Sequence, residues 1–298
     1  MIEKIPIPIC GLILALLSLG NLLNDTHPYL RVLCATIGII LMILILAKLI
    51  LYPKNIKKDL KNPVIASNSG TFSMSLMLLS TYLSQFMPDI ACGVWILGVA
   101  LHISLMIYFT HHFIISNFDI STVYPSYWIV FIGITMAAIT AHVHGLNEIG
   151  FIFFLAGFIA MLITLPLVIY RYLKYSDIPD ANKPLICIFN AVLSILIVGY
   201  INSYNSISIE FLGIMYAFAC IFYIFSLIKF LEYRKLDFYP SFAAFTFPFV
   251  ISTLATKGVI SKIGSNIILD DVLTLQTIIA SAIVLYVLIK YIKFLSRN

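Results

Sequence analysis

Long apolar runs, separated by short polar segments, follow one another from end to end of this 298-residue chain. A membrane-spanning helix needs roughly 20 consecutive, mostly apolar residues. Strands of a membrane barrel would instead alternate apolar and polar residues, and these runs are continuous. The pattern therefore predicts an all-α integral membrane protein, with residues 1–298 forming a single transmembrane domain of ten helices. The expected helices cover residues 7–23, 30–52, 68–86, 90–115, 127–146, 149–173, 185–203, 207–231, 242–260 and 272–294.

The composition agrees with a lipid bilayer as the surrounding medium. Hydrophobic residues make up 61% of the chain and charged residues 10%, whereas soluble domains carry about 25% charged residues. A soluble core could not bury this much apolar surface. The cysteines all lie inside apolar runs and form no CxxC pair, which favours packing over a metal or redox site.

The distribution of positive charge predicts the orientation in the membrane. If the N-terminus is cytoplasmic and the chain crosses ten times, 15 of the 18 lysines and arginines fall on the cytoplasmic side. Only Arg31, Lys257 and Lys262 fall outside. Positive residues concentrate on the cytoplasmic side of membrane proteins. We therefore expect both termini in the cytoplasm at the cell membrane, and we interpret the net charge of +5 as a topology signal rather than as nucleic-acid binding.

A repeated sequence motif indicates internal periodicity. The chain reads "VYPSYWIVFIGI" from Val123 and "FYPSFAAFTFPF" from Phe238. Prolines stand at the entry of every odd-numbered expected helix, 55 to 62 residues apart, at Pro8, Pro63, Pro125, Pro184 and Pro240. Proline is well tolerated in the first turn of a helix. The regular period indicates five helical hairpins that all point the same way, unlike the inverted repeats of many coupled transporters.

Odd- and even-numbered helices differ in residue size. The odd helices are rich in glycine, alanine, serine and threonine, whereas the even helices carry bulky side chains, as in "LMILILAKLILY". Small residues also permit close helix packing, which is the alternative explanation for each of them. The systematic difference favours an inner ring of five odd helices around a central pore. The predicted pore-lining residues are Gly11, Thr71, Ser73, Gly133, Ala191, Ser194 and Thr246.

Several of these segments resemble a known family. The segments "IPIPICGLILALLSLGNLL", "GTFSMSLMLLSTYL", "VYPSYWIVFIGI" and "FYPSFAAFTFP" are similar to the tellurite-resistance/dicarboxylate transporter family. That family includes bacterial tellurite-resistance proteins, malate transporters and the slow anion channels of plant guard cells. The resemblance implies ten helices as five hairpins around a pore, permeation by anions, and a homotrimer with one pore in each protomer.

The resemblance also implies a pore gate. In the family a phenylalanine from the ninth helix plugs the pore, and the aromatic–hydroxyl–aromatic segment matches Phe245-Thr246-Phe247, which assigns the gate to Phe247. The alternative is that Phe247 only packs. Pro248 is the one proline clearly inside an odd-numbered span and is expected to kink it. Related sequences often carry further mid-helix prolines, at positions occupied here by Ser73, Val130 and Val192.

Ionisable side chains are absent from the middle of the odd helices, which bears on mechanism. Such groups usually mark proton relays and ion-coupled sites. Their absence argues against a proton-driven pump and against a deep, fixed anion site. Weakly hydrated anions would then pass more easily. Lysines at the inner mouth would concentrate anions there or would serve as topology markers only.

The histidines offer few chemical sites. His102, in the middle of an even helix, is expected to bond a neighbour's backbone. His142 and His144 form a His-x-His pair, which binds zinc only with further ligands and could alternatively sense pH. No catalytic motif is present, so we expect no enzyme, no metal and no cofactor. The predicted function is an anion channel or facilitative anion transporter for small inorganic anions or C4-dicarboxylates. The alternative is an active exporter of toxic oxyanions such as tellurite or sulfite, or of other compounds.

Overall fold

The computed structural model describes residues 2–175, 177–204 and 206–297, and in these residues the chain is helical with no β-strand. Seven helical segments are long and apolar enough to cross a membrane. Five are single long helices, although a π-helical turn, η2 (Thr110–Ile115), extends α5. These five are α2 (Pro28–Leu51), α5 (Pro88–Phe109), α8 (Asn147–Lys174), α10 (Ile209–Tyr233) and α12 (Ile267–Arg297).

The other two segments begin as 3-10 helices and continue as α-helices. They are η5 (Asp180–Ile188) with α9 (Phe189–Ser203), and η6 (Pro240–Phe245) with α11 (Phe247–Ile263). Three further apolar elements accompany them: α1 (Ile9–Leu23), α4 (Pro63–Leu83), and the pair α6 (Tyr127–Phe131) and α7 (Thr135–Ala141), which is extended by η4 (His142–His144).

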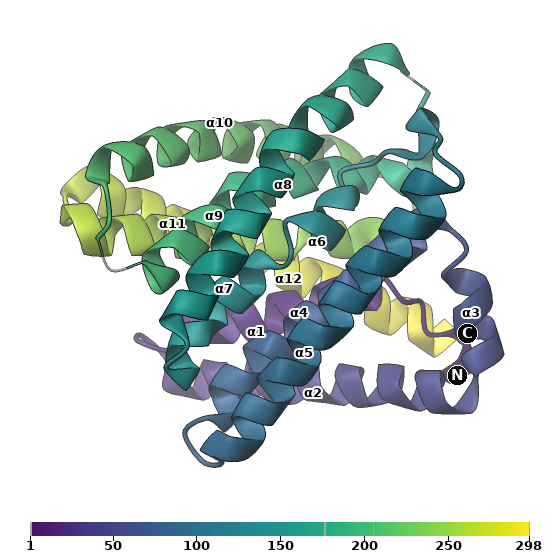
Figure 1. Ribbon diagram of the computed structural model, residues 1–298, viewed down its shortest axis with the longest axis horizontal. Coiled ribbons are helices and arrows are strands. Elements are labelled where there is room, and N and C mark those ends of the chain that lie inside the picture. Colours follow the sequence, from purple (N-terminus) through teal and green to yellow (C-terminus); the bar gives the residue numbers. More distant parts are fainter. Residues whose placement is uncertain (1, 176, 205, 298) are drawn as a thin grey trace.

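Five segments form a closed ring in the interior. α1 contacts α4, α4 contacts α6 and α7, α7 contacts α9, α9 contacts α11, and α11 contacts α1. Each carries a following long helix on its outer side: α2 on α1, α5 on α4, α8 on α7, α10 on α9, and α12 on α11. In Figure 1, α2, α5, α8 and α10 flank this interior. The short helices η1 (Ile2–Lys4) and α3 (Pro53–Asp59) lie at the same end as the C-terminal end of α12, and η3 (Ile120–Thr122) precedes α6.

Burial separates the two layers. In the inner segments Asp180–Ser203 and Pro240–Ile263, 94% and 78% of the most apolar stretch is buried, against 28% to 33% in the five long outer helices. The outer helices expose many isoleucines and leucines, among them Ile43, Ile107, Ile163 and Ile221. Such a continuous apolar exterior would be unstable in water and is suited to lipid.

Three of the five inner segments change helix type or break partway along. The sequence predicts one helix over residues 127–146, and this prediction is wrong in detail, because α6 ends at Phe131 and α7 begins at Thr135. The amide of Gly133 bonds the carbonyl of Trp128, five residues back, so the regular helical ladder is interrupted there. The break forms without proline. Pro248, expected to kink the ninth span, instead stands in the first turn of α11, directly after the break at Thr246.

Two glycines allow α7 to pack closely against α8 and α9. A β-carbon built on Gly157 would lie 2.0 Å from the Oγ1 of Thr135, and one built on Gly199 would lie 2.4 Å from its Cγ2. Real β-carbons do not approach other atoms this closely. Thr135 of α7 therefore occupies a space that only glycine leaves open on both neighbours.

We expect Gly199→Ala to lower the free energy of unfolding by about 1–3 kcal/mol, because overpacking a tight contact forces backbone or side-chain shifts. Chemical or thermal unfolding in detergent measures this. Gly213→Ala on α10 is the matched control, since nothing lies within 4 Å of a β-carbon there. The control should be neutral or slightly stabilising. Equal effects of both substitutions would contradict the proposed close approach.

Candidate functional site

A small central cavity of about 50 Å3 lies inside the ring, and all five inner segments line it. Its walls are mainly apolar, and the polar side chains among them are Asn68 and Thr71. Each of these bonds a carbonyl of its own helix: Asn68 Nδ2 donates to Val64 O at 2.7 Å, and Thr71 Oγ1 donates to Asn68 O at 2.7 Å. The cavity has room for no more than a few waters, since one water needs roughly 10–15 Å3 measured this way. No charged side chain is among its lining residues.

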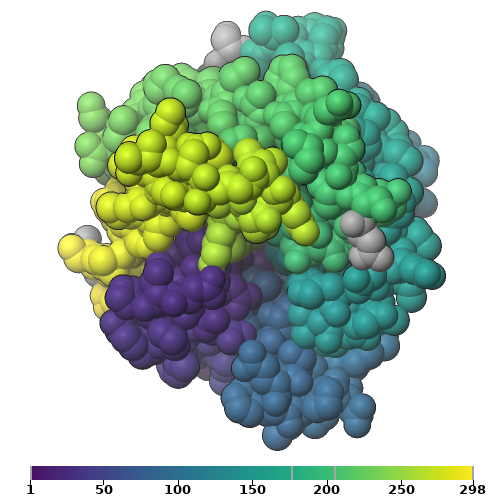
Figure 2. Space-filling model, turned by 90° about the vertical axis from the view of Figure 1, so that its left-hand side faces the viewer, coloured from purple at the N-terminus to yellow at the C-terminus, as the bar shows by residue number. Residues whose placement is uncertain are grey.

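Two larger cavities lie on either side of the central cavity, along the axis of the ring. The proximal cavity, of about 430 Å3, lies at the end that holds η1 and α3, and its lining includes Pro8, Ile65, Asn182 and Tyr239. The distal cavity, of about 410 Å3, lies at the opposite end. Figure 2 views that opposite end, which is hollowed near its centre.

The order of lining residues shows that the three cavities share one axis. Along α4, Ile65 lines the proximal cavity, Thr71 the central cavity and Leu78 the distal cavity. The same order holds along α1 with the residues just before it, along η5–α9 and along η6–α11. Residues of α6 and α7 line the central and distal cavities and are not among those lining the proximal cavity. The inner segments therefore run in the same direction around a common axis, which is narrowest in the middle.

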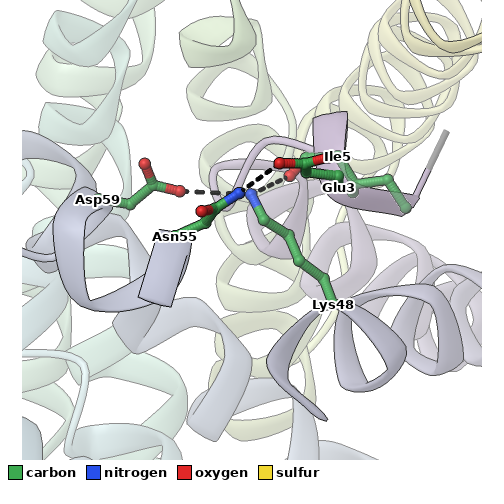
Figure 3. A network of polar contacts seen from close by, with 5 residues as sticks. All are labelled: Glu3, Ile5, Lys48, Asn55 and Asp59. Atoms are coloured by element: carbon green, nitrogen blue, oxygen red, sulfur yellow. Dashed lines mark hydrogen bonds and ion pairs between the residues drawn. The ribbon is translucent and has the colours of Figure 1, made fainter. Parts of the chain in front are cut away.

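A polar network lies beside the proximal cavity (Figure 3). Lys48 of α2 is 4% exposed, and its Nζ donates to the carbonyl of Ile5 at 2.7 Å and lies 3.3 Å from Asp59 Oδ2. Beside it, Asn55 Nδ2 donates to Glu3 Oε1 at 2.9 Å. These contacts tie the N-terminal segment to α3 and neutralise Lys48, so the net positive charge among the cavity's lining side chains comes from Lys4.

Phe247 is the first residue of α11 and lines the central cavity. It is 7% exposed, whereas Phe245 and Phe249 are fully buried. The rings of Phe245 and Phe249 both pack edge-on against Phe230 of α10. Among the described aromatic side chains, none makes a ring contact with Phe247. The three phenylalanines therefore differ in their surroundings, and Phe247 is the one that faces the axis.

The structure brings together most, but not all, of the predicted lining residues. Gly11, Thr71, Gly133, Ala191 and Pro248 line the central cavity with Phe247. Ser73, Ser194 and Thr246 are buried away from it. A serine or threonine on an inner helix can face the axis or a neighbouring helix, and its residue type does not decide between them.

Ser73 takes part in a hydrogen-bonded chain that supports the break after α6. Its Oγ lies 2.8 Å from Nδ1 of His102 on α5, and His102 Nε2 lies 3.0 Å from the carbonyl of Val130. His102 is fully buried. The expectation that His102 bonds a neighbour's backbone is therefore confirmed, and the acceptor lies at the point where the helical ladder is interrupted.

A second buried network joins α9 to α11. Asn190 Nδ2 donates to the carbonyl of Pro248 at 3.1 Å, and Ser252 Oγ donates to Asn190 Oδ1 at 2.5 Å. Ser194 Oγ lies 2.8 Å from Ser252 Oγ and donates to the carbonyl of Asn190 at 2.8 Å. These bonds fix the first turn of α11, and with it the backbone that carries Phe247. The Thr246 hydroxyl donates to the carbonyl of Ala243 at 2.6 Å and lies 3.3 Å from the carbonyl of Gly11.

Trp128 is a cavity residue that the sequence analysis missed. It lines the central cavity, is 2% exposed, and its indole Nε1 is buried without a hydrogen-bond partner in the described structure. Its ring packs edge-on against Phe189. The available signal was its place three residues after the proline of the repeated "YPS" motif, at a helix entry.

Gly133 is a predicted lining residue that lies at the break between α6 and α7. The sequence analysis placed it on the lining, and it does contact the central cavity. However, a β-carbon at Gly133 would lie 2.1 Å from the carbonyl of Ile129 and 2.9 Å from Met74 Sδ. A bulky residue there would disturb the break itself, so blocked flux in such a variant would not identify a lining position.

The His-x-His pair makes separate contacts instead of a shared site. His144 Nε2 lies 2.9 Å from Ser80 Oγ, and His142 Nδ1 lies 2.9 Å from the carbonyl of Ile139. His142 also lines the distal cavity. Within the described residues there is no group of three or more histidines, cysteines or acids that could hold a metal ion.

Comparison with known proteins identifies the family. The family model described as SLAC1, voltage-dependent anion channel, matches residues 5–292. The chain belongs to this SLAC1 family. The SLAC1-family chain is also 26% identical to an uncharacterized transporter of Methanocaldococcus jannaschii over 241 residues, which are 73% of this chain and 70% of that protein. The resemblance inferred from the sequence is confirmed, and the protein is a multi-pass membrane protein of a family of anion channels and transporters.

In this SLAC1-family protein we expect His102→Leu to lower the free energy of unfolding by about 1–3 kcal/mol. The buried carbonyl of Val130 loses its side-chain donor, and the Ser73 hydroxyl keeps only its bond to the carbonyl of Gly70. Thermal unfolding in detergent measures the effect. Ser104→Ala, at an exposed position of the same helix, should change little. Ser73→Ala added to His102→Leu should cost less than the sum of the two single effects. Full additivity would mean that the two residues do not interact.

Proposed function

We propose that the protein conducts anions along the axis of its inner ring, with Phe247 as the gate. The observation that carries this proposal is the order of the three cavities along segments that run in parallel, with the narrowest cavity lined by Phe247. Membership of a voltage-dependent anion channel family supports anions as the permeating species. The ring of Phe247 would have to move for an ion to pass between the two larger cavities.

The chemistry of the central cavity favours weak binding and rapid release. Its lining offers an amide, a hydroxyl and the indole of Trp128 but no charge. An ion entering it would lose much of its hydration shell, and little in the wall would replace it. We therefore propose that weakly hydrated anions such as nitrate pass more easily than chloride. Dicarboxylates, tellurite and sulfite remain candidate substrates by family resemblance alone.

For the membrane topology we propose ten crossings, arranged as five parallel hairpins with both termini in the cytoplasm. Each inner segment is followed by an outer helix that packs against it, which supports this arrangement. Four of the five repeat prolines begin or precede an inner segment, as at Pro63 of α4 and Pro240 of η6, whereas Pro184 lies within η5. We also propose a homotrimer with one pathway per protomer, which rests on family resemblance and can be tested by crosslinking in native membranes.

Single cysteines introduced at Lys58 and Lys262, in a background without the native cysteines, should react with membrane-impermeant reagents from opposite sides of the membrane. Lys58 lies on α3 and Lys262 near the end of α11. Both side chains are exposed, so access by the reagent is not limited by packing. Labelling of both positions from one side would refute the ten-crossing arrangement.

Phe247→Ala should raise anion flux by about tenfold or more, since removing as little as 1.4 kcal/mol from a barrier raises a rate tenfold. Phe247→Leu should be intermediate, because leucine fills part of the volume. Flux of nitrate and chloride from proteoliposomes at a set voltage measures both variants. The cost in stability should be small relative to other buried phenylalanines, since the ring already borders a cavity.

Phe249→Leu is the matched control for the gate. Phe249 lies two residues further along α11 and packs against Phe230 and Tyr223 rather than the axis. Its substitution should reduce stability and leave flux unchanged. A well-folded Phe247→Ala protein that conducts no more than the parent would rule out Phe247 as the gate. Flux that requires a proton gradient would instead support the active exporter.

A further inference from the structure

The distal cavity contains a cation without an acidic partner. Arg31, in the first turn of α2, lines this cavity, and none of the ion pairs among the described residues includes it. No aspartate or glutamate is among the residues that line the cavity. The acid nearest in sequence, Asp25, lies 2.8 Å from Lys257 Nζ, and the hydrogen bond from Lys257 lowers the pKa of Asp25. The charge of Arg31 is therefore not neutralised within its own cavity.

The guanidinium of Arg31 is held by an aromatic platform. Its central carbon lies 4.5 Å from the centroid of the Tyr82 ring, within the range of a cation–π contact. The Tyr82 hydroxyl donates to the carbonyl of Leu17 at 2.5 Å, which anchors the ring to α1. Gly20 leaves the room for this contact, because a β-carbon there would lie 2.6 Å from the Tyr82 hydroxyl oxygen. Arg31 is thus positioned by residues of three helices.

The donors of Arg31 are only partly used. Its Nε is buried and has no hydrogen-bond partner in the described structure. Among the described residues, Tyr82 is the one side chain that contacts the guanidinium, and the two terminal nitrogens are not among the buried unpaired atoms. Amide side chains also line the cavity, at Asn21, Asn24, Gln85 and Asn202. Such a wall offers hydrogen-bond donors around one fixed positive charge.

We propose that the distal cavity binds a small planar oxyanion, nitrate or a carboxylate, on the guanidinium of Arg31. The planar fork of guanidinium matches two oxygens of such an anion, whereas chloride can use only one contact point. This site would lie at the mouth where an anion enters or leaves the proposed pathway, and its role rests on that proposed function. The proximal cavity differs in its chemistry. There Lys48 is paired with Asp59, and the remaining positive charge is the ammonium of Lys4, which lacks a planar fork.

Binding at this site should be weak and reversible. The cavity is wide and open to water, so the charge of Arg31 is screened by solvent and salt. A pathway needs sites that concentrate ions without trapping them. The site would therefore concentrate planar oxyanions at the distal mouth, and transport of these anions would depend on the side from which they are supplied.

The test is a nitrate titration of the purified full-length protein in detergent, with chloride replaced at constant ionic strength and the midpoint of thermal unfolding as the readout. We expect a saturable rise in the midpoint with nitrate. Arg31→Gln should raise the half-saturating concentration at least about tenfold, because a charge-assisted bidentate contact is lost. Arg31→Lys, which keeps the charge but not the fork, should be intermediate. Lys262→Gln removes an exposed charge of the same end and should titrate like the parent.

A second variant keeps the proposal testable if Arg31→Gln does not fold. Gln85→Glu places a carboxylate in the cavity at an exposed position and should weaken nitrate binding while Arg31 remains. The site would be refuted by Arg31→Gln or Gln85→Glu proteins that titrate like the parent, or by a parent without a saturable nitrate response. If nitrate binding follows these expectations while Phe247→Ala carries no extra anion flux, the distal site stands and the proposed gate fails.

Discussion

The architecture depends on hydrogen bonds to backbone polar groups at the points where inner helices break within the apolar interior. An unpaired carbonyl in lipid or in a dry core costs several kcal/mol, so spanning segments normally stay fully helical. This chain interrupts its helices beside the central cavity, and side chains of neighbouring helices provide hydrogen-bond donors to backbone carbonyls there. His102 of α5 meets the carbonyl of Val130, and Asn190 of α9 meets the carbonyl of Pro248. The breaks are therefore stable features of the ring.

These breaks determine what reaches the axis. Because α11 begins at Phe247, the side chains before and after the break do not follow one continuous helical surface. Phe245 and Phe249 both turn toward Phe230 of α10, and Phe247 is left facing the cavity. Close packing through Gly157 and Gly199 holds α7 against α8 and α9. The small central cavity is thus shaped by packing and hydrogen bonding, and no ionisable side chain is among its lining residues.

Much of this fold could be predicted from the sequence, because the bilayer imposes long apolar runs that are easily recognised. The expected spans 30–52 and 149–173 differ from α2 and α8 by only a few residues, and the contrast between small and bulky side chains corresponds to the inner and outer layers. The break at Gly133 could not be predicted, because its cause is a partner on another helix, His102. For the same reason Ser73 and Ser194 were expected on the axis but bond neighbouring residues instead. Local sequence indicates that a residue is small or polar and leaves open which neighbour it faces.

For the gate that we propose at Phe247, the closed state would rest on the contacts of its ring. Its ring makes no ring–ring contact among the described residues, and its hydrocarbon surface offers no hydrogen bond, so dispersion and rotamer preference hold it in the cavity. Such contacts are individually weak, and a modest shift of the backbone that carries the ring changes many of them together. Asn190 of α9 donates a hydrogen bond to the carbonyl of Pro248 in that backbone. The hydroxyl of Thr246, just before Phe247, lies close to the carbonyl of Gly11 on α1. Under this proposal, the equilibrium between closed and open arrangements would depend on how α9, α11 and α1 pack against one another. A stimulus that moves any one of these helices would then act on the proposed gate without touching the ring itself.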